Sequence, residues 1–299
     1  VLKKCCKTAL FFKISNINIS KKQQTFEKEF SLKGIGLHSG KKIDLIFQPA
    51  DTDNGIKFIR TDISNNNSIN ALWSNVSSTN LCTTISNDKG VEVGAGGGFS
   101  KNFIKNKNFK ISDLAQFRHL DHKNVDAQNT RYESNSYDFV IAVNMIHHVP
   151  YPTKFFDEMH RILKVGGKLI IQEANCSLIF QLVTILMRHE GFDFTKNVWS
   201  KESPLSDEND IWSGNIAVPH LIFDNKEAFE KNLGSKFSMI HQKFYECFVF
   251  LNSGGVSSKT FYIPLNKNFL KILNCIDGIL TKIFPSIFAM GRQIVLKKN

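Results

Sequence analysis

The sequence contains no C-x-x-C pair, although six cysteines are spread along its 299 residues. A zinc cluster built from cysteines is therefore not expected, and the dispersed thiols are typical of a reducing compartment, so we expect a cytoplasmic location. No run of about 18 apolar residues occurs, so no membrane-spanning helix is expected. Acidic residues are scarce, since 27 Asp and Glu stand against 38 Lys and Arg, a formal net charge of +11.

The excess of basic residues favours anionic partners such as acidic lipid surfaces, phosphorylated substrates or nucleic acid. The lysines are scattered among Asn, Ile and Phe rather than gathered in one block, so no specific nucleic-acid site is predicted. Residues 1–23 contain a short apolar stretch that Lys13 interrupts, and no small-residue cleavage site follows. We therefore expect a poorly ordered leader there rather than a signal peptide.

The stretch that organises the rest of the chain is V-E-V-G-A-G-G-G-F-S, from Val91 to Ser100. It predicts a short buried strand, a glycine loop and a helix over residues 99–105. This order is the nucleotide-binding pattern of doubly wound α/β folds, in which glycines permit a sharp turn and a close approach of the ligand. A dinucleotide fingerprint, G-x-G-x-x-G, needs its third glycine where Phe99 stands, which argues against an NAD-dependent oxidoreductase.

Strands and helices alternate from residue 91 onward, which predicts a mostly parallel sheet. The expected strands are 91–93, 109–113, 125–127, 137–144 and 169–173, with a helix at 155–163 and a turn at 165–168. Asp113 ends the second of these strands, about 20 positions after Glu92, where an acidic residue is placed to bind ribose hydroxyls.

Three segments, residues 91–100, 136–149 and 158–169, match a known family in order. Their E-x-G-x-G-x-G, S-Y-D-F-V and E-M-H-R-I-L-K-V-G-G-K-L sequences resemble the class I S-adenosylmethionine-dependent methyltransferases of type 11, with Val165 in place of the family's proline. The resemblance implies a Rossmann-like, doubly wound sheet over 91–299 with an antiparallel last strand at 292–297. It also implies S-adenosylmethionine as cofactor and methyl transfer to a small-molecule, sugar or lipid-linked acceptor.

By this resemblance, Glu92 orders the glycine loop and the amino group of the cofactor, Asp113 binds the ribose hydroxyls and Asp126 binds the adenine amino group. The full set of implied cofactor residues is Glu92, Gly94, Ala95, Gly96, Gly98, Asp113, Asp126, Ala127 and Asn144. The general base is open among His147 and His148, which follow the fourth strand, and Glu173, which ends the fifth. The histidines could instead only cap the strand or face solvent.

Residues 24–90 predict a small β-rich partial domain with strands at 43–47, 55–60 and 81–85. The sequences G-I-G-L-H-S-G at 34–40, F-Q-P-A at 47–50 and C-T-T at 82–84 resemble the N-terminal part of UDP-3-O-acyl-N-acetylglucosamine deacetylase, the zinc amidase of lipid A biosynthesis. The resemblance stops near Val93, before the helix that would supply a zinc-binding His and its Glu base.

No metal site is therefore expected. His122 and Asp126 have a spacing that could place two ligands on one helix face, but no apolar helical stripe surrounds them. The two resemblances meet without a linker, which favours a recombined or misassembled reading frame over a natural fusion. The alternatives to methyl transfer are a deacetylase-related fragment without a zinc site and a non-catalytic remnant that only binds ligand.

Two further features lie beyond the family motifs. Residues 174–223 form an insertion with an apolar run, Leu178–Met187, and the tryptophans Trp199 and Trp212; we expect a lid over the substrate. Residues 266–283 predict an amphipathic helix at helical spacing. Its apolar side either packs on the sheet or, aided by nearby lysines, docks on a membrane surface, which would make the protein membrane-peripheral.

Overall fold

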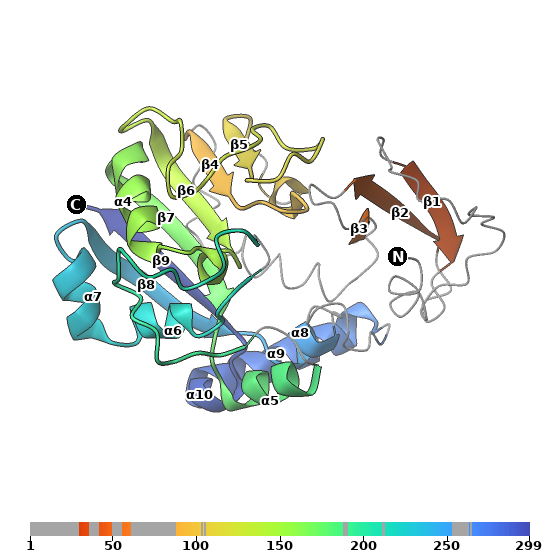
Figure 1. Ribbon diagram of the computed structural model, residues 1–299. Helices are drawn as coiled ribbons and strands as arrows, with labels where there is room; N and C mark the ends of the chain where they lie inside the picture. Colours follow the sequence, from red (N-terminus) through yellow and green to blue (C-terminus); the bar gives the residue numbers. More distant parts are fainter. Residues whose placement is uncertain are drawn as a thin grey trace.

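The computed structural model describes the strands at 30–35, 42–49 and 56–60, and residues 88–299 apart from 103, 105, 188–190, 211–212, 253–262 and 264. Its main feature is a six-stranded sheet in the order β5-β4-β6-β7-β9-β8 (Figure 1). The strands are β4 Gly90–Val93, β5 Phe109–Ser112, β6 Tyr137–Val143, β7 Leu163–Ala174, β8 Phe237–Tyr245 and β9 Gly291–Lys298.

The four strands β5, β4, β6 and β7 run parallel, and β9 lies antiparallel between β7 and β8. The chain leaves β4 toward β5 on one side and later returns to β6 on the other side. The strand order therefore reverses at β4, and the carboxyl edge of an open α/β sheet at such a point is where ligands bind. The Rossmann-like α/β sheet with an antiparallel last strand, expected from the sequence, is confirmed.

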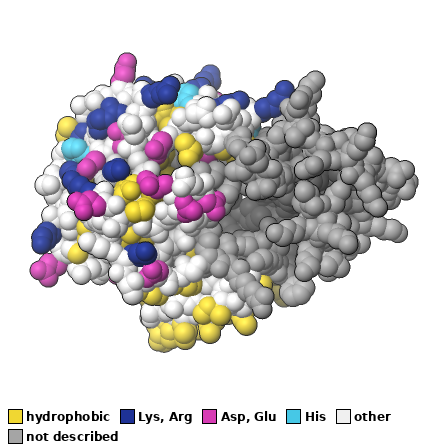
Figure 2. Space-filling view, in the orientation of Figure 1, with side chains coloured by type: hydrophobic (Ala, Val, Ile, Leu, Met, Phe, Trp, Pro, Cys, Tyr) yellow, Lys and Arg dark blue, Asp and Glu magenta, His cyan; other side chains and the backbone are white. Residues whose placement is uncertain are grey.

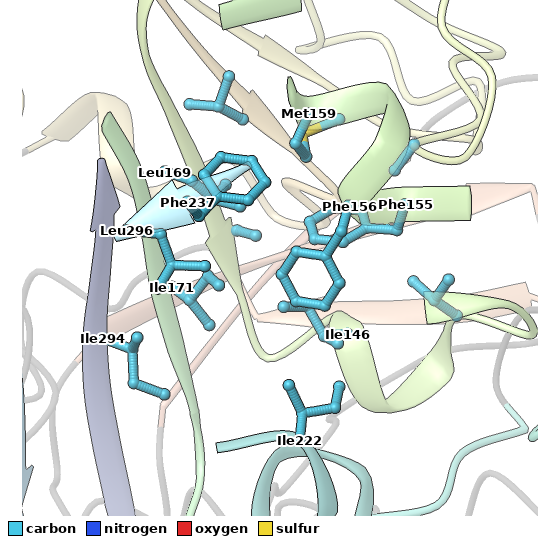
Figure 3. Close-up of a cluster of buried hydrophobic side chains, with 14 of the residues drawn as sticks. Ile146, Phe155, Phe156, Met159, Leu169, Ile171, Ile222, Phe237, Ile294 and Leu296 are labelled. Atoms are coloured by element: carbon cyan, nitrogen blue, oxygen red, sulfur yellow. The ribbon is translucent and has the colours of Figure 1, made fainter. Parts of the chain in front are cut away.

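One face of the sheet is covered by the helices α4 Pro152–Ile162, α6 Val218–Phe223 and α7 Lys226–Leu233. Phe156 of α4 meets the rings of Phe223 and Phe237 edge to face. Figure 3 shows side chains of α4, of α6 and of the turn η4 Ile146–His148 gathered beside Ile171 of the sheet. Helix α4 begins three residues before the predicted start because Pro152, which is suited to a first helical turn, opens it.

The opposite face carries a second core, in which Phe139 of β6 stacks on Phe109 of β5. Here the prediction of a helix over 99–105 is wrong: among the described residues of this range, one 3-10 turn, η3 Phe99–Asn102, is the only helical structure. The glycine loop occupies the first part of the connection from β4 to β5, which leaves the rest of the connection for any helix. The buried side chains of Ala115, Phe117 and Leu120, from the segment after β5, belong to this second core.

The predicted third strand at 125–127 is also wrong. His122 makes only an isolated parallel bridge to Ser112, and the Val125 N–H donates to the Asp113 carbonyl. Polar residues on both sides of Val125 leave no apolar run that could extend the pairing. The segment nevertheless lies beside β5, so Asp126 stays near the end of that strand.

The predicted turn at 165–168 is part of β7, at a place where the pairing of β7 with β6 shifts in register. Tyr137 pairs with Leu163, whereas Phe139 pairs with Lys168, so the intervening residues bulge out of the ladder. Gly166 provides the left-handed backbone of this bulge, with φ of 77°.

A third group of helices lies at the lower edge of the molecule in Figure 1. It comprises α5 Leu178–Met187, α8 Phe248–Asn252, α9 Lys267–Ile283 and α10 Pro285–Phe288. These helices surround a small core of Phe180, Ile216, Cys247 and Met290. Within the described residues, none of the helices combines the length and the apolar character needed to cross a bilayer.

The N-terminal part contains β1 Phe30–Ile35, β2 Lys42–Pro49 and β3 Ile56–Arg60, paired antiparallel in that order. Two of these strands were predicted from the sequence. The expected leader at 1–23 and the expected strand at 81–85 lie outside the described residues. The β-rich partial domain as a whole therefore stays a prediction.

Glu246, which follows β8, is a buried carboxyl group in a left-handed backbone conformation, with φ of 62°. Burial, together with the nearby charge of Asp277, raises its pKa from 4.5 to about 8. Its Oε1 has no hydrogen-bond partner among the described residues. The folded protein therefore holds a neutral acid here at pH 7.

We expect the wild-type protein to lose stability as the pH rises from 4.5 to about 8. Glu246→Gln should make this loss smaller. In this window the folded chain keeps a proton that the unfolded chain has released, so the free energy of unfolding falls as the pH rises. Below the ordinary pKa both states hold the proton and the stability is fully present. Urea unfolding across this pH range measures the slope. The exposed Glu133→Gln should keep the wild-type slope, and a Glu246→Gln curve parallel to wild type would contradict the prediction.

Candidate functional site

The glycine loop lies at the carboxyl end of β4, where the strand order reverses. Gly94, Gly96 and Gly98 have φ of 69°, 49° and 68°, a left-handed region that residues with a Cβ rarely adopt. A Cβ on Gly98 would lie 2.8 Å from side-chain carbons of His119 and Ile111. A Cβ on Gly96 would have no atom of the described residues within 4 Å. Gly98 is thus required by packing, whereas Gly96 borders open space.

Asp113, at the end of β5, holds this loop in place. Its Oδ2 accepts a hydrogen bond of 2.7 Å from the Gly96 N–H, and its Oδ1 accepts one of 2.9 Å from the Ala115 N–H. A carboxylate has about four acceptor positions, so each oxygen keeps capacity for a ligand hydroxyl. From the other side, the His119 Nε2–H donates to the Gly96 carbonyl over 2.8 Å. The loop is therefore fixed before any ligand arrives.

Glu92 lies on β4 just before the loop, with its side chain fully buried beside Ser100. The Ser100 hydroxyl donates to Glu92 Oε2. Burial raises the pKa of Glu92 to about 8, and the negative charge of Asp113 acts in the same direction. A cation bound above the loop would favour the ionised form. Glu92 is thus placed to support the loop and to balance a positive ligand group without touching solvent.

The remaining implied cofactor residues lie around the same edge. Asp126 and Ala127 follow Val125, whose N–H binds the Asp113 carbonyl, so they lie beyond the end of β5. Asp126 Oδ1 accepts a hydrogen bond of 2.8 Å from the Gln128 N–H. Asn144 is exposed directly after β6, with φ of 48°. Met145 comes next and lies against Gly94, where an added Cβ would meet its side chain at 2.9 Å.

His147 and Glu173 form a buried pair at the ends of β6 and β7. His147 Nδ1 lies 2.6 Å from Glu173 Oε2, while Glu173 Oε1 accepts from the N–H groups of Met145 and Ile146. Glu173 is only 1 % exposed. Burial alone would raise its pKa, but His147 and the backbone donors outweigh burial and hold the pKa below its ordinary value. Glu173 is therefore an ionised acceptor that fixes the turn η4 Ile146–His148 and the ring of His147.

The insertion contacts this turn through its backbone. The Asn215 N–H donates to the His147 carbonyl over 2.9 Å, and His148 Nδ1–H donates to the Ser213 carbonyl over 3.1 Å. The ring of His148 lies 4.2 Å from that of His147. Part of the insertion thus borders the candidate site, which keeps the lid hypothesis open. Trp199 packs instead against the main core, and Trp212 lies outside the described residues.

Sequence reasoning missed His119, Ser100 and Met145, which support the loop from three sides. No local motif identifies His119, because its contact with Gly96 depends on the irregular segment after β5. The spacing of His122 and Asp126 does not produce a metal pair: His122 Nδ1 is hydrogen-bonded to the Tyr132 hydroxyl over 2.8 Å. Within the described ranges, no three His, Cys, Asp or Glu side chains are grouped to hold a metal ion.

A fixed glycine loop at the switch point, with an acid at the end of the neighbouring strand, defines an α/β domain that binds a nucleoside-containing cofactor. The family model described as "Methyltransferase domain" matches residues 91–171. This part of the chain therefore matches a methyltransferase domain, in agreement with the class expected from the sequence.

The family model for UDP-3-O-acyl N-acetylglycosamine deacetylase matches residues 23–95. The chain is 42 % identical over 71 residues to the UDP-3-O-acyl-N-acetylglucosamine deacetylase of Shewanella pealeana, covering 24 % of this chain and 23 % of that protein. It is 52 % identical over 63 residues to the same enzyme of Geotalea uraniireducens, covering 21 % and 20 %. The chain thus spans about a quarter or less of the length of these relatives.

Solved structures with a similar fold include a SAM-dependent methyltransferase from Archaeoglobus fulgidus, with 13 % identity, a TM-score of 0.46 and coverage of 77 % of this chain and 94 % of that one. Another is the trans-methyltransferase CalH in complex with SAH, with 12 % identity, a TM-score of 0.41 and coverage of 74 % and 54 %. Likeness at this level does not identify an activity, so the assignment rests on the family match and on the geometry of the site.

Proposed function

We propose that residues 91–299 bind S-adenosylmethionine at the carboxyl edge of β4 and transfer its methyl group to a small-molecule, sugar or lipid-linked acceptor. The proposal rests on the geometry of Gly96. Its N–H donates to Asp113, and the space where a side chain would project is open. A backbone held this way lets a ligand approach as closely as a glycine loop allows. Core packing does not require it.

The residues around the loop fit the cofactor chemically. Asp113 retains acceptor capacity for ribose hydroxyls, and Asp126 lies beyond the end of the same strand for the adenine end. Glu92, with its raised pKa, can ionise beneath a cationic ligand. When bound, S-adenosylmethionine supplies an electrophilic methyl group, and the protein contributes mainly proximity and alignment.

For the general base we assign His147 rather than Glu173. Glu173 is buried, and its two oxygens already accept from two backbone N–H groups and face His147 Nδ1. Its role is to position His147, whose ring can take a proton from a hydroxyl or amine near neutral pH. His148, which binds the Ser213 carbonyl, holds the insertion over the turn.

We expect Asp113→Ala to weaken binding of S-adenosylhomocysteine by about tenfold or more, since two ribose hydroxyls lose their acceptor at a cost of ~1–3 kcal/mol. Isothermal calorimetry with S-adenosylmethionine, S-adenosylhomocysteine and NADH measures this. Asp138→Ala is the matched control, because Asp138 pairs with Lys164 and the Lys89 N–H at the amino end of β6. Binding of NADH alone would contradict the proposed cofactor, and unchanged affinity in Asp113→Ala would contradict the site.

The second candidate activity is deacetylation of UDP-3-O-acyl-N-acetylglucosamine, which the match over residues 23–95 raises. We expect the full chain to release no acetate from this substrate and to purify without stoichiometric zinc. The reason is that the match ends before the helix which, by the resemblance, supplies a zinc-binding His and its Glu base. Metal analysis together with an acetate assay tests this expectation, and one zinc per chain with measurable acetate release would overturn it.

A further inference from the structure

Helix α9 buries the polar side chains of Asp277 and Thr281 and exposes a stripe of large apolar side chains. Its inward face consists of Leu270, Asn274, Asp277 and Thr281, which recur at helical spacing. Its outward face consists of Phe269, Ile272, Ile276, Ile279 and Ile283, all exposed, with Ile272 at 58 %. Leu273 and Leu280, which the sequence places on the same apolar side, are half-buried. The packing of the apolar side as a whole on the sheet, one of the two alternatives from the sequence, is therefore wrong.

The orientation of α9 is fixed by Asp277, which is 2 % exposed. Its carboxylate accepts hydrogen bonds of 2.9–3.0 Å from the N–H groups of Cys247, Phe248 and Val249 at the start of α8. The Thr281 hydroxyl adds a bond to the Asp277 carbonyl. Turning the helix to bury its apolar stripe would expose these donors and the Asp277 carboxylate. The outward direction of the stripe is thus built into the fold.

Neighbouring helices extend the apolar surface. The stripe of Leu178, Leu182, Ile185 and Leu186 on α5 is exposed, with Leu186 at 77 %. Phe284 and Ile287 are exposed around α10, which contacts both α5 and α9. Figure 2 shows apolar side chains gathered at the lower edge of the molecule, where Figure 1 places these three helices. An exposed apolar patch that covers three neighbouring helices marks an interaction site.

The charges on this surface favour one occupant. Lys271 and Lys282 are exposed on α9, whereas the one acidic residue of the three helices, Asp277, is buried. Apolar residues that project between lysines, with no exposed acid on these three described helices, match the interfacial region of a bilayer with acidic lipids. A second copy of this chain would place like charges against each other, because both copies would present the same lysines.

We propose that α5, α9 and α10 form a surface that docks on a bilayer containing acidic lipids. Strands β7 and β8 are both antiparallel to β9, so their carboxyl ends lie at the same edge of the sheet as the glycine loop. Helices α5 and α8 follow these two strand ends directly. Docking therefore turns the edge that carries the candidate site toward the membrane. A lipid-linked acceptor would then lie close to the candidate site. This last inference rests on the proposed function, whereas the docking itself does not.

The full chain is sedimented with vesicles of phosphatidylcholine mixed with phosphatidylglycerol, and with vesicles of phosphatidylcholine alone. We expect recovery in the pellet with the acidic vesicles, little with the neutral ones, and release by added salt. The double variant Ile272→Asp, Ile279→Asp should stay in the supernatant. Lys271→Gln and Lys282→Gln should each weaken binding about fivefold. Circular dichroism checks that each variant is folded.

Val165→Asp is the matched control, since Val165 is 76 % exposed in the bulge at the opposite edge of the sheet; it should pellet like wild type. Equal recovery in the supernatant with and without acidic vesicles would overturn the proposal. So would a wild-type dimer in sedimentation velocity without lipid that the double variant dissociates, which would make this surface an interface between copies. Calorimetry with S-adenosylhomocysteine, performed without vesicles, reports on the cofactor site independently.

Discussion

Replacing Gly96 by alanine should abolish measurable binding of S-adenosylmethionine while the protein stays folded. In the folded chain a Cβ at this position meets no atom of the described residues within 4 Å, so the methyl group itself causes no clash with them. The cost to folding is confined to the left-handed backbone at φ of 49°, about 1–2 kcal/mol for a residue with a side chain. The same methyl group fills the space through which the cofactor approaches, so we expect a loss of affinity of about 100-fold or more, ~3 kcal/mol.

Two other glycines separate binding from folding in this experiment. Gly98→Ala should destabilise the loop itself, because its Cβ would lie 2.8 Å from carbons of His119 and Ile111. Gly278 also borders open space but lies in α9, so Gly278→Ala should leave binding unchanged and add up to about 1 kcal/mol of helix stability. Calorimetry gives the affinities and urea unfolding gives the stabilities. If Gly96→Ala binds S-adenosylmethionine with wild-type affinity, the glycine loop does not form the cofactor site.

The sequence allowed β4, β5, β6 and the second half of β7 to be predicted, because buried strands that alternate with helices carry short apolar or alternating segments between turn residues. Strand β6 is the clearest case, with Phe139, Val140, Ile141 and Ala142 in succession. The glycine loop was also readable, since its glycines must adopt a left-handed backbone wherever such a loop turns. These two signals are local, which is why the strands and the loop could be predicted, whereas the strand order that creates the switch point could not.

The helix predicted over 99–105 failed because a local pattern does not report how much chain a crossover has available. The orientation of α9 was left open by the sequence for a different reason. Periodicity shows that Ile272 and Ile276 share a face, but it does not show which way that face points. That direction is decided by the hydrogen bonds that Asp277 accepts from the backbone N–H groups at the start of α8, contacts between residues about 30 positions apart.

The pairing of His147 with Glu173 was only partly foreseeable. Both were candidates from their positions after strands, and adjacent parallel strands bring their carboxyl ends to one edge. The division of roles could not be foreseen, because it depends on Glu173 accepting the backbone N–H groups of Met145 and Ile146. These hydrogen bonds exist only once the turn at Met145 and Ile146 has formed, so the sequence alone does not reveal them.

Arg292 of β9 should be the most costly charged residue to replace. Its side chain is 1 % exposed, its Nη2 donates to Asp224 Oδ2 over 2.9 Å, and its Nε donates to Asn175 Oδ1 over 3.1 Å. Its guanidinium also lies 5.3 Å from the centre of the Phe244 ring. Asn175 and Asp224 stand at the two ends of the insertion, so Arg292 joins the base of that segment to the central sheet.

We expect Arg292→Met to lower the free energy of unfolding by about 3 kcal/mol, since removing one partner leaves Asp224 and Asn175 without their donor. The loss is at the lower end of the range for buried ion pairs because Asp224 is partly exposed and can still interact with His220. Arg292→Lys should recover only part of it, because an ammonium group cannot reproduce the planar fork that binds both side chains. Urea unfolding measures these values.

Lys236→Met is the matched control: Lys236 pairs with Asp157 at the surface, and such pairs contribute about 0–1 kcal/mol. Hydrogen exchange adds a second measurement, since loss of the link at the base should increase exchange at the Asn215 N–H, which binds the His147 carbonyl. An Arg292→Met protein as stable as Lys236→Met, with unchanged exchange at Asn215, would show that the insertion does not depend on this link. An increase in exchange together with weaker cofactor binding would instead mean that Arg292 stabilises the candidate site through the turn that carries His147.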